Sequence, residues 1–168
     1  MSEWRMLTLV GEDQPGIVAA VTRTLFESGF SLGEASMIRM GGNFTIMMMI
    51  SGEGDADALL RPVTEAMNLR LHVYDTGGVL HRHMAPNVQI RVNGADRAGI
   101  VAQVTNALAE KGFNILELES DVAGTQEQPV YIMHIEGYCE CPVEELEQIV
   151  SALGELNVDV SPIETLIG

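Results

Sequence analysis

The stretch GEDQPGIVA, residues 11–19, returns 83 residues later as GADRAGIVA, residues 94–102. The match continues as far as Glu34 over Glu117, and half of the aligned positions from 11 to 36 are identical. Unrelated segments would agree at far fewer positions. The chain is therefore an internal duplication, and the repeat has to be recognised before any helix or strand is assigned.

Each copy alternates between strand-like and helix-like patterns. Strands are expected where apolar and polar residues alternate, and helices where apolar residues recur every three or four positions. The first copy then reads as strand 4–10, a helix from Ile17 that stops at Gly29, strands 31–40 and 44–51, helix 55–67 and strand 69–75. The second reads as strand 88–92, helix 100–111, strands 114–122 and 130–137, helix 142–153 and strand 158–163.

Three positions predict local geometry. The sequence Gly41-Gly42-Asn43 between two strands is typical of a tight hairpin turn. Pro62 predicts a kink or a late start in the second helix, because proline lacks an N–H and clashes with the preceding turn. Pro142 is expected at a first helical position, where its missing N–H would be unpaired anyway.

The element order βαββαβ, present twice, defines the fold class. It is the split βαβ arrangement, so we expect an α+β chain of two ferredoxin-like domains, each a four-stranded antiparallel sheet with helices on one face. The boundaries predicted are a first domain at 1–76, a linker at 77–86 and a second domain at 87–168. The other sheet face would be covered by the second copy or by another protomer, since an uncovered apolar face promotes aggregation.

The charge balance limits the partners. With 24 acidic and 9 basic side chains, the formal net charge is −15. Nucleic-acid affinity depends on Lys and Arg that displace counterions from phosphates, so direct binding to DNA or RNA is not expected. The N-terminus has no signal-peptide pattern and no apolar run approaches the roughly 20 residues of a membrane helix. A cytoplasmic protein without a membrane segment is expected.

Several polar residues could suggest a metal site. The two cysteines, Cys139 and Cys141, are separated by one residue, which we consider too short for an ordinary disulfide; reduced thiols in a reducing cytosol are expected. A zinc site would need two further ligands, and nothing in the sequence brings the His81-Arg82-His83 segment of the linker near them. We predict no metal and no cofactor.

Two further features are assigned to packing. The run Met47-Met48-Met49 alternates with Phe44 and Ile50, which favours core packing over an adaptable ligand surface. His134, on a predicted strand, is expected to be a lone packed or capped imidazole.

The repeated D-x-x-G-I-V pattern lies where the first strand of each copy leads into a helix. The N–H groups at a helix start lack intrahelical partners and carry partial positive charge, so they could hold a carboxylate. Gly16 and Gly99 would permit unusual φ values and close approach, and Asp13 and Asp96 could bind an ammonium group. The same residues could equally be an N-cap or Asx turn followed by a permissive glycine, and the residues alone leave both interpretations open.

These motifs resemble a known family. Two βαββαβ copies, each with D-x-P-G-I-V or a near equivalent and a G-F-S-L or G-F-N-I junction after the first helix, are similar to tandem ACT domains. The length and the two-copy layout most resemble the glycine cleavage system transcriptional repressor family. The resemblance implies amino-acid binding at interfaces between ACT units, through the loop after the first strand and the start of the second. Carried over, the ligand-binding residues are Asp13, Gln14, Pro15, Gly16, Ile17, Ser31, Leu32, Asp96, Arg97, Ala98, Gly99, Ile100, Asn114 and Ile115.

The two copies depart from the family pattern in different places. Ser31 stands where the family usually has Asn, and Ala98 where it usually has Pro. Asn114 retains an amide that could bond a ligand, whereas the Ser31 hydroxyl is shorter. Two equal sites are therefore not expected.

Other functions were weighed against this one. No G-x-S-x-G, phosphate loop, H-E-x-x-H or dinucleotide fingerprint occurs, so an enzyme is not predicted. RNA-recognition modules share the βαββαβ order but need aromatic and basic residues on the central strands, where this chain has Met, Ile and Glu.

The sequence therefore predicts a non-enzymatic regulatory protein that binds an amino acid, glycine by family analogy. It would modulate a protein partner such as a DNA-binding transcriptional regulator, through an indirect repression of the glycine cleavage system. A homodimer is expected. The alternative is a protein-interaction or oligomerisation module without a ligand.

Overall fold

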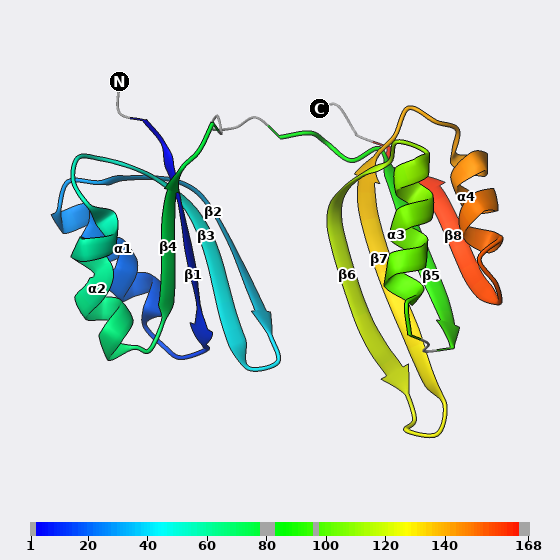
Figure 1. The fold of residues 1–168 in the computed structure, drawn as a ribbon, viewed down its shortest axis with the longest axis horizontal. Coiled ribbons are helices and arrows are strands. Elements are labelled where there is room, and N and C mark those ends of the chain that lie inside the picture. The colour runs from blue at the N-terminus through cyan, green and yellow to red at the C-terminus, as the bar shows by residue number, and fades with distance from the viewer. Residues whose placement is uncertain (1–2, 78–82, 96–97, 165–168) are drawn as a thin grey trace. The chain divides into compact units, whose positions relative to one another are not determined.

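A computed structural model describes residues 3–77, 83–95 and 98–164. The chain forms two compact units, Met1–Arg82 and His83–Gly168, and each unit is described here by itself. Both units contain six elements in the order βαββαβ (Figure 1).

The first unit is a four-stranded sheet with two helices. Its strands lie in the order β2-β3-β1-β4, and all three neighbouring pairs are antiparallel. Helices α1 and α2 lie on the same side of the sheet (Figure 1). The elements are β1 (Arg5–Glu12), α1 (Ile17–Glu27), β2 (Ser31–Met40), β3 (Asn43–Ser51), α2 (Ala56–Ala66) and β4 (Arg70–Asp75).

The second unit repeats this arrangement. The strand order is β6-β7-β5-β8, again with antiparallel pairs only. Its elements are β5 (Val88–Ala95), α3 (Ile100–Glu110), β6 (Asn114–Gly124), β7 (Pro129–Tyr138), α4 (Val143–Ser151) and β8 (Leu156–Pro162). The predicted pair of ferredoxin-like α+β domains is thus confirmed.

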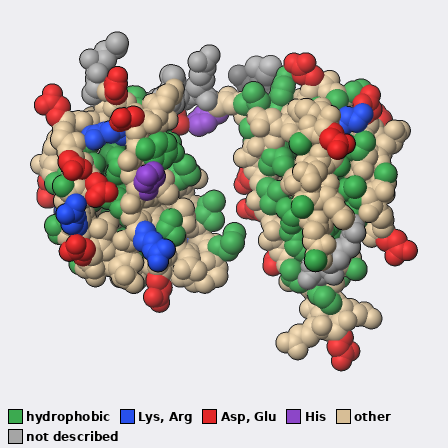
Figure 2. All heavy atoms as spheres, in the orientation of Figure 1, with side chains coloured by type: hydrophobic (Ala, Val, Ile, Leu, Met, Phe, Trp, Pro, Cys, Tyr) green, Lys and Arg blue, Asp and Glu red, His purple; other side chains and the backbone are tan. Residues whose placement is uncertain are grey.

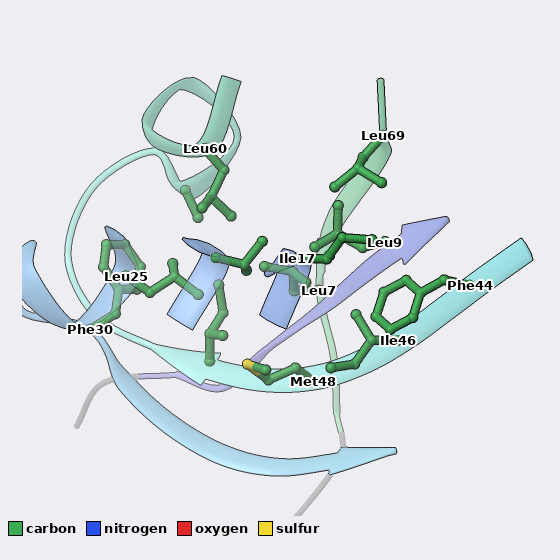
Figure 3. Packing of buried hydrophobic residues seen from close by; sticks show 13 residues of the cluster. Leu7, Leu9, Ile17, Leu25, Phe30, Phe44, Ile46, Met48, Leu60 and Leu69 are labelled. Carbon is green, nitrogen blue, oxygen red and sulfur yellow. The ribbon is translucent and has the colours of Figure 1, made fainter. Parts of the chain in front are cut away.

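A layer of apolar side chains between the helices and the sheet holds each unit together. In the first unit Leu7 and Leu9 of β1 are completely buried, and they meet Leu25 of α1 and Leu60 of α2, which are equally buried. Figure 3 shows these side chains pointing toward one another from the helices and the strands. The second unit has an equivalent cluster that includes Ile90. Burial of such side chains is the dominant stabilising contribution to a fold of this size.

The turns agree with the sequence analysis where glycine is required. Met40 pairs with Asn43, so the β2–β3 hairpin has a two-residue loop. Gly41 and Gly42 have φ values of 56° and 77°, the left-handed backbone that a two-residue hairpin of type I′ demands. Gly29, after α1, has φ 82° and ends that helix as predicted.

Of the kink or late start predicted at Pro62, the late start is not observed, and the position predicted for Pro142 needs correction. Helix α2 does not start late: Asp55 caps it, accepting bonds from the N–H groups of Asp57 at 3.0 Å and Ala58 at 3.2 Å, and Pro62 lies inside it. A well-capped first turn explains why the helix begins ahead of the proline. Pro142 precedes the first helical residue, as the N-cap of α4 with extended ψ, and does not occupy the first position.

The expectation of reduced cysteines is also wrong, because Cys139 and Cys141 form a disulfide. The chain turns at Glu140, just after β7, and this turn brings the two Cα atoms to 5.3 Å, within the usual range for a disulfide. Asn87 fixes the backbone of Cys139 from both sides, since its side chain accepts from the Cys139 N–H at 3.0 Å and donates to the Cys139 carbonyl at 2.8 Å.

The methionine run divides between the two faces of the first sheet. Met48 lies on the helix-covered face and is 4% exposed, in agreement with the prediction of core packing. Met49 is also buried, whereas Met47 is 43% exposed. The packing prediction therefore fails for Met47, whose side chain points to the face that the helices leave uncovered.

Candidate functional site

A surface hollow of about 650 Å³ lies beside the turn that joins β1 to α1. It contains the predicted segment Asp13–Ile17 together with three residues of the neighbouring hairpin that the sequence analysis did not identify. The lining residues are Asp13, Gln14, Pro15, Gly16, Ile17, Val18, Ala19, Met37, Arg39 and Phe44.

The start of α1 forms one wall of the hollow and presents backbone N–H groups. Gly16 is the N-cap, with φ 90° in the left-handed region, and no side chain caps this helix among the described residues. The first intrahelical bond runs from the Ala20 N–H to the Gly16 carbonyl at 2.9 Å. The N–H groups before it lack intrahelical partners, and the helix dipole adds partial positive charge, so this wall suits an anion.

Gly16 is required by its conformation and not by close packing. No heavy atom lies within 4 Å of the position that a Cβ would occupy. The predicted unusual φ is therefore observed, and the space beside Gly16 is open. A non-glycine residue would bring left-handed strain of about 1–2 kcal/mol at this position.

Asp13 does not cap α1, because the N-cap is Gly16 and no side-chain bond caps this helix among the described residues. Its N–H donates to the Gly42 carbonyl at 3.0 Å, and its carboxylate forms an ion pair with the Arg39 guanidinium. The Asp13 side chain is 25% exposed and that of Arg39 is 67% exposed. The Asp13 carboxylate, which we predicted to bind the ammonium group of a ligand, is thus already paired with Arg39 of β2.

Two other residues of the predicted segment have structural contacts. The Gln14 side-chain amide donates to the Met67 carbonyl at 2.9 Å, which ties the loop to the end of α2. The Ile17 side chain is 2% exposed and belongs to the core. Ile17 can therefore contribute only its backbone to the hollow, while Val18, which is 39% exposed, contributes an apolar side chain.

Ser31 and Leu32 lie away from this hollow. They begin β2, whereas Arg39 is near its end, and the rise of a strand puts Ser31 and Arg39 roughly 26 Å apart. Within one unit the loop after β1 and the start of β2 therefore do not form a common site.

The second unit has the same turn at the start of α3. Gly99 is the N-cap with φ 84°, and the Gln103 N–H bonds to its carbonyl at 2.9 Å. Ala98 is exposed, and the Ile100 side chain is buried in the core. Asp96 and Arg97 fall outside the described residues.

The start of β6 holds the other two predicted residues of this unit. The Asn114 amide lies 3.6 Å from the Met84 sulfur, and Ile115 is partly buried. As in the first unit, these residues are at the beginning of their strand and not beside the helix start.

The strand pairing in the two sheets identifies the residue of the second unit that corresponds to Arg39. Arg39 lies opposite Phe44, which is itself opposite the first residue of the repeated stretch. Val122 holds the same place in the second unit, opposite Tyr131. The two units thus share the turn and the helix start, but a guanidinium in one corresponds to an isopropyl group in the other.

The other candidate residues do not form a metal site within the part of the chain that the structure describes. In the described part of the chain no three His, Cys, Asp or Glu residues gather as metal ligands would, and His81 and Arg82 lie outside it. His134 lies on β7 with its Nε2 buried, 3.9 Å from Glu136 Oε1 and without a hydrogen bond among the described residues. No helix among the described residues is long and apolar enough to cross a membrane.

The outer sheet faces do not resemble an RNA platform. On the central strands of the first unit this face carries Thr8, Thr45 and Met47, without an aromatic ring. In the second unit His134 of the central strand β7 lies between Arg91 of β5 and Glu119 of β6, so the one arginine there is close to an acidic residue and no ring stack is formed by these three residues. Stacking rings and cations are the features that RNA recognition on such a sheet requires.

The described chain consists of two ferredoxin-like units, each with a helix after its first strand that begins at a left-handed glycine. The ACT-domain models match residues 5–73 and 88–157. The chain therefore belongs to the ACT-domain family.

Proteins similar to the whole chain include transcriptional repressors. The glycine cleavage system transcriptional repressors of Escherichia coli strain K12 and of Shigella flexneri are each 27% identical over 165 residues, which is 93% of this chain and 87% of theirs.

Solved structures share the fold. An unknown protein from Galdieria sulphuraria has a TM-score of 0.76 and 22% identity, covering 98% of this chain and 100% of that one. A protein described as a candidate glycine cleavage system transcriptional repressor has a TM-score of 0.70 and 20% identity, covering 98% and 99%.

Proposed function

We propose that this protein is a non-enzymatic regulator that binds an amino acid, glycine by analogy with its repressor relatives, and thereby alters its interaction with a protein partner. The observation that carries the proposal is the hollow beside α1, which is lined by the uncapped start of the helix and by the Asp13 carboxylate in its ion pair with Arg39. Donors for a carboxylate beside an acceptor for an ammonium group match the two charged ends of an amino acid.

The net charge of the chain is the reason that we propose an indirect regulation of transcription. Acidic side chains are spread over the face of both units in Figure 2. A chain of net charge −15 is repelled by DNA, so control of transcription would pass through a DNA-binding protein. Partner and amino acid would then change each other's affinity by the same factor, as linkage requires.

We also propose a location and an oligomeric state for the protein, namely a homodimer in the cytoplasm. In a dimer the start of β2, which is remote from the hollow of its own unit, could be brought to the hollow of another ACT unit. Light scattering combined with size-exclusion chromatography measures the oligomeric state directly.

Calorimetry with a panel of amino acids tests the proposal. We expect the wild-type protein to bind at least one of them, glycine included, and expect Asp13→Ala and Asp96→Ala each to weaken binding at its own site by about tenfold or more, as loss of a charge-assisted bond would. Asp57→Ala is the matched control, because Asp57 is an exposed carboxylate on α2 outside the hollow. If the wild-type protein binds none of the amino acids, the chain is a protein-interaction module and the proposal is wrong.

A further inference from the structure

The ion pair between Asp13 and Arg39 spans two elements that line the same hollow. Asp13 belongs to the loop after β1, and Arg39 belongs to β2. Gln14 is the other polar side chain of the lining, and the exposed apolar side chains are those of Met37 and Val18. The hollow thus contains one anion and one cation, held against each other, beside an apolar surface.

We propose that this ion pair is the specificity element of the first unit and that a zwitterionic α-amino acid binds by inserting into it. The Arg39 guanidinium takes the ligand carboxylate, together with the N–H groups at the start of α1, and the released Asp13 carboxylate takes the ammonium group. This inference rests on the proposed function and names the ligand class and the residue that selects it.

The charges explain why a zwitterion is selected. Insertion of a zwitterion replaces one ion pair by two, so every charge keeps a partner. A ligand with only a carboxylate brings a second anion to Asp13, which is only 25% exposed, and a ligand with only an ammonium group forgoes the bonds to Arg39 and to the helix N–H groups, so both are bound more weakly.

The exposure of the pair makes the exchange feasible. The Arg39 side chain is 67% exposed, and ion pairs at that exposure contribute little to stability because water and salt screen them. The ion pair can therefore open at small cost when a ligand arrives. The apolar lining from Met37, Val18 and Phe44 favours an uncharged, apolar ligand side chain.

The second unit provides an internal comparison. Val122 replaces Arg39 and Ser120 replaces Met37, as the ladder positions opposite Tyr131 and Met133 show. The helix start is retained, but the strand position equivalent to Arg39 carries no cation. The selectivity for a zwitterion is therefore a property of the first unit.

Calorimetry with chemically blocked ligands tests this inference. The probes are leucine and glycine, their amides, in which the carboxylate is blocked, and their N-acetyl derivatives, in which the ammonium group is blocked. On the wild-type protein each zwitterion is expected to bind the first unit about 10- to 100-fold more tightly than either blocked form.

Two variants test whether the ion pair causes the preference for zwitterions. Arg39→Gln is expected to weaken binding of the zwitterion by about 10- to 100-fold and to strengthen binding of leucinamide, because Asp13 then has no cationic partner to give up. Asp13→Asn frees the guanidinium, so N-acetylleucine is expected to bind more tightly than to the wild type, an increase that structural damage would not produce. Arg61→Gln is the matched control, since Arg61 is 63% exposed and is also paired with an aspartate, Asp57.

The outcomes separate this inference from the proposed function. If neither leucine, glycine nor any other amino acid of the panel binds the wild type, the proposed function fails. If an amino acid binds but Arg39→Gln binds it as the wild type does, or a blocked form binds as tightly as its zwitterion, the inference is overturned and the proposed function stands. Trp4 fluorescence during urea unfolding verifies that each variant is folded.

Discussion

Replacing Leu9 by alanine lowers the free energy of unfolding of the first unit by about 2–5 kcal/mol, the range for a large-to-small change in a core. Leu9 is completely buried. It lies on a central strand, opposite Ile46 of β3 and Leu71 of β4, and it faces the helices. Its truncation leaves a cavity between sheet and helices that rigid neighbours on both sides cannot fill.

Urea unfolding followed by Trp4 fluorescence measures this loss. Trp4 is the only tryptophan of the chain and directly precedes β1, so its signal reports the first unit. Val10→Ala is the matched control, because Val10 is the next residue of the same strand but is 40% exposed on the other face; a change within about 0.5 kcal/mol is expected. Equal losses for the two variants would contradict the assignment of Leu9 to the core.

Alanine at Gly137 is expected to destabilise the second unit by about 1–3 kcal/mol or more through overpacking. A Cβ at this position would lie 2.4 Å from the Asn114 carbonyl oxygen and 2.4 Å from Cε1 of Phe113. The Phe113 ring is buried, and the Asn114 carbonyl is part of the backbone of the paired strand β6. Neither group can move without disturbing the ladder or the core.

Hydrogen exchange of the amides in β6 and β7 measures this effect. Exchange in these strands should become faster in Gly137→Ala, because the ladder opens more often in a destabilised unit. Gly77→Ala is the control, since no atom lies within 4 Å of its added Cβ and its φ is not in the left-handed region. Unchanged protection of β6 and β7 in Gly137→Ala would show that the strands tolerate a side chain there.

Most of the fold follows from local sequence patterns. The repeat, the alternation in strands and the glycines at Gly29 and Gly41 are local signals, and each predicted the observed element or turn. The errors came from competing contacts: the Asp55 cap fixes the start of α2 despite Pro62. The bond between Cys139 and Cys141 depends on the backbone direction after β7, which spacing in the sequence does not reveal.

Only one part of the candidate site could be predicted from the sequence. The loop and helix start of the hollow lie within one continuous motif, whereas Arg39 is far from Asp13 along the chain. The signal was nevertheless present, because a two-residue turn at Gly41-Gly42 fixes the hairpin register and so places Arg39 opposite Phe44. The position of Ser31 at the far end of β2 follows from the same register, and family resemblance alone could not supply it.

The central claim is that an amino acid binds at the turn after β1. The most direct test is to titrate the ¹⁵N-labelled protein with glycine and with leucine and to follow the chemical shifts of the backbone amides. The largest shifts are expected at the N–H groups of Gly16, Ile17 and Val18, with smaller ones at Arg39 on the facing strand. Saturable shifts that spare these amides and concentrate on the outer faces of the sheets would contradict the claim and place the ligand elsewhere.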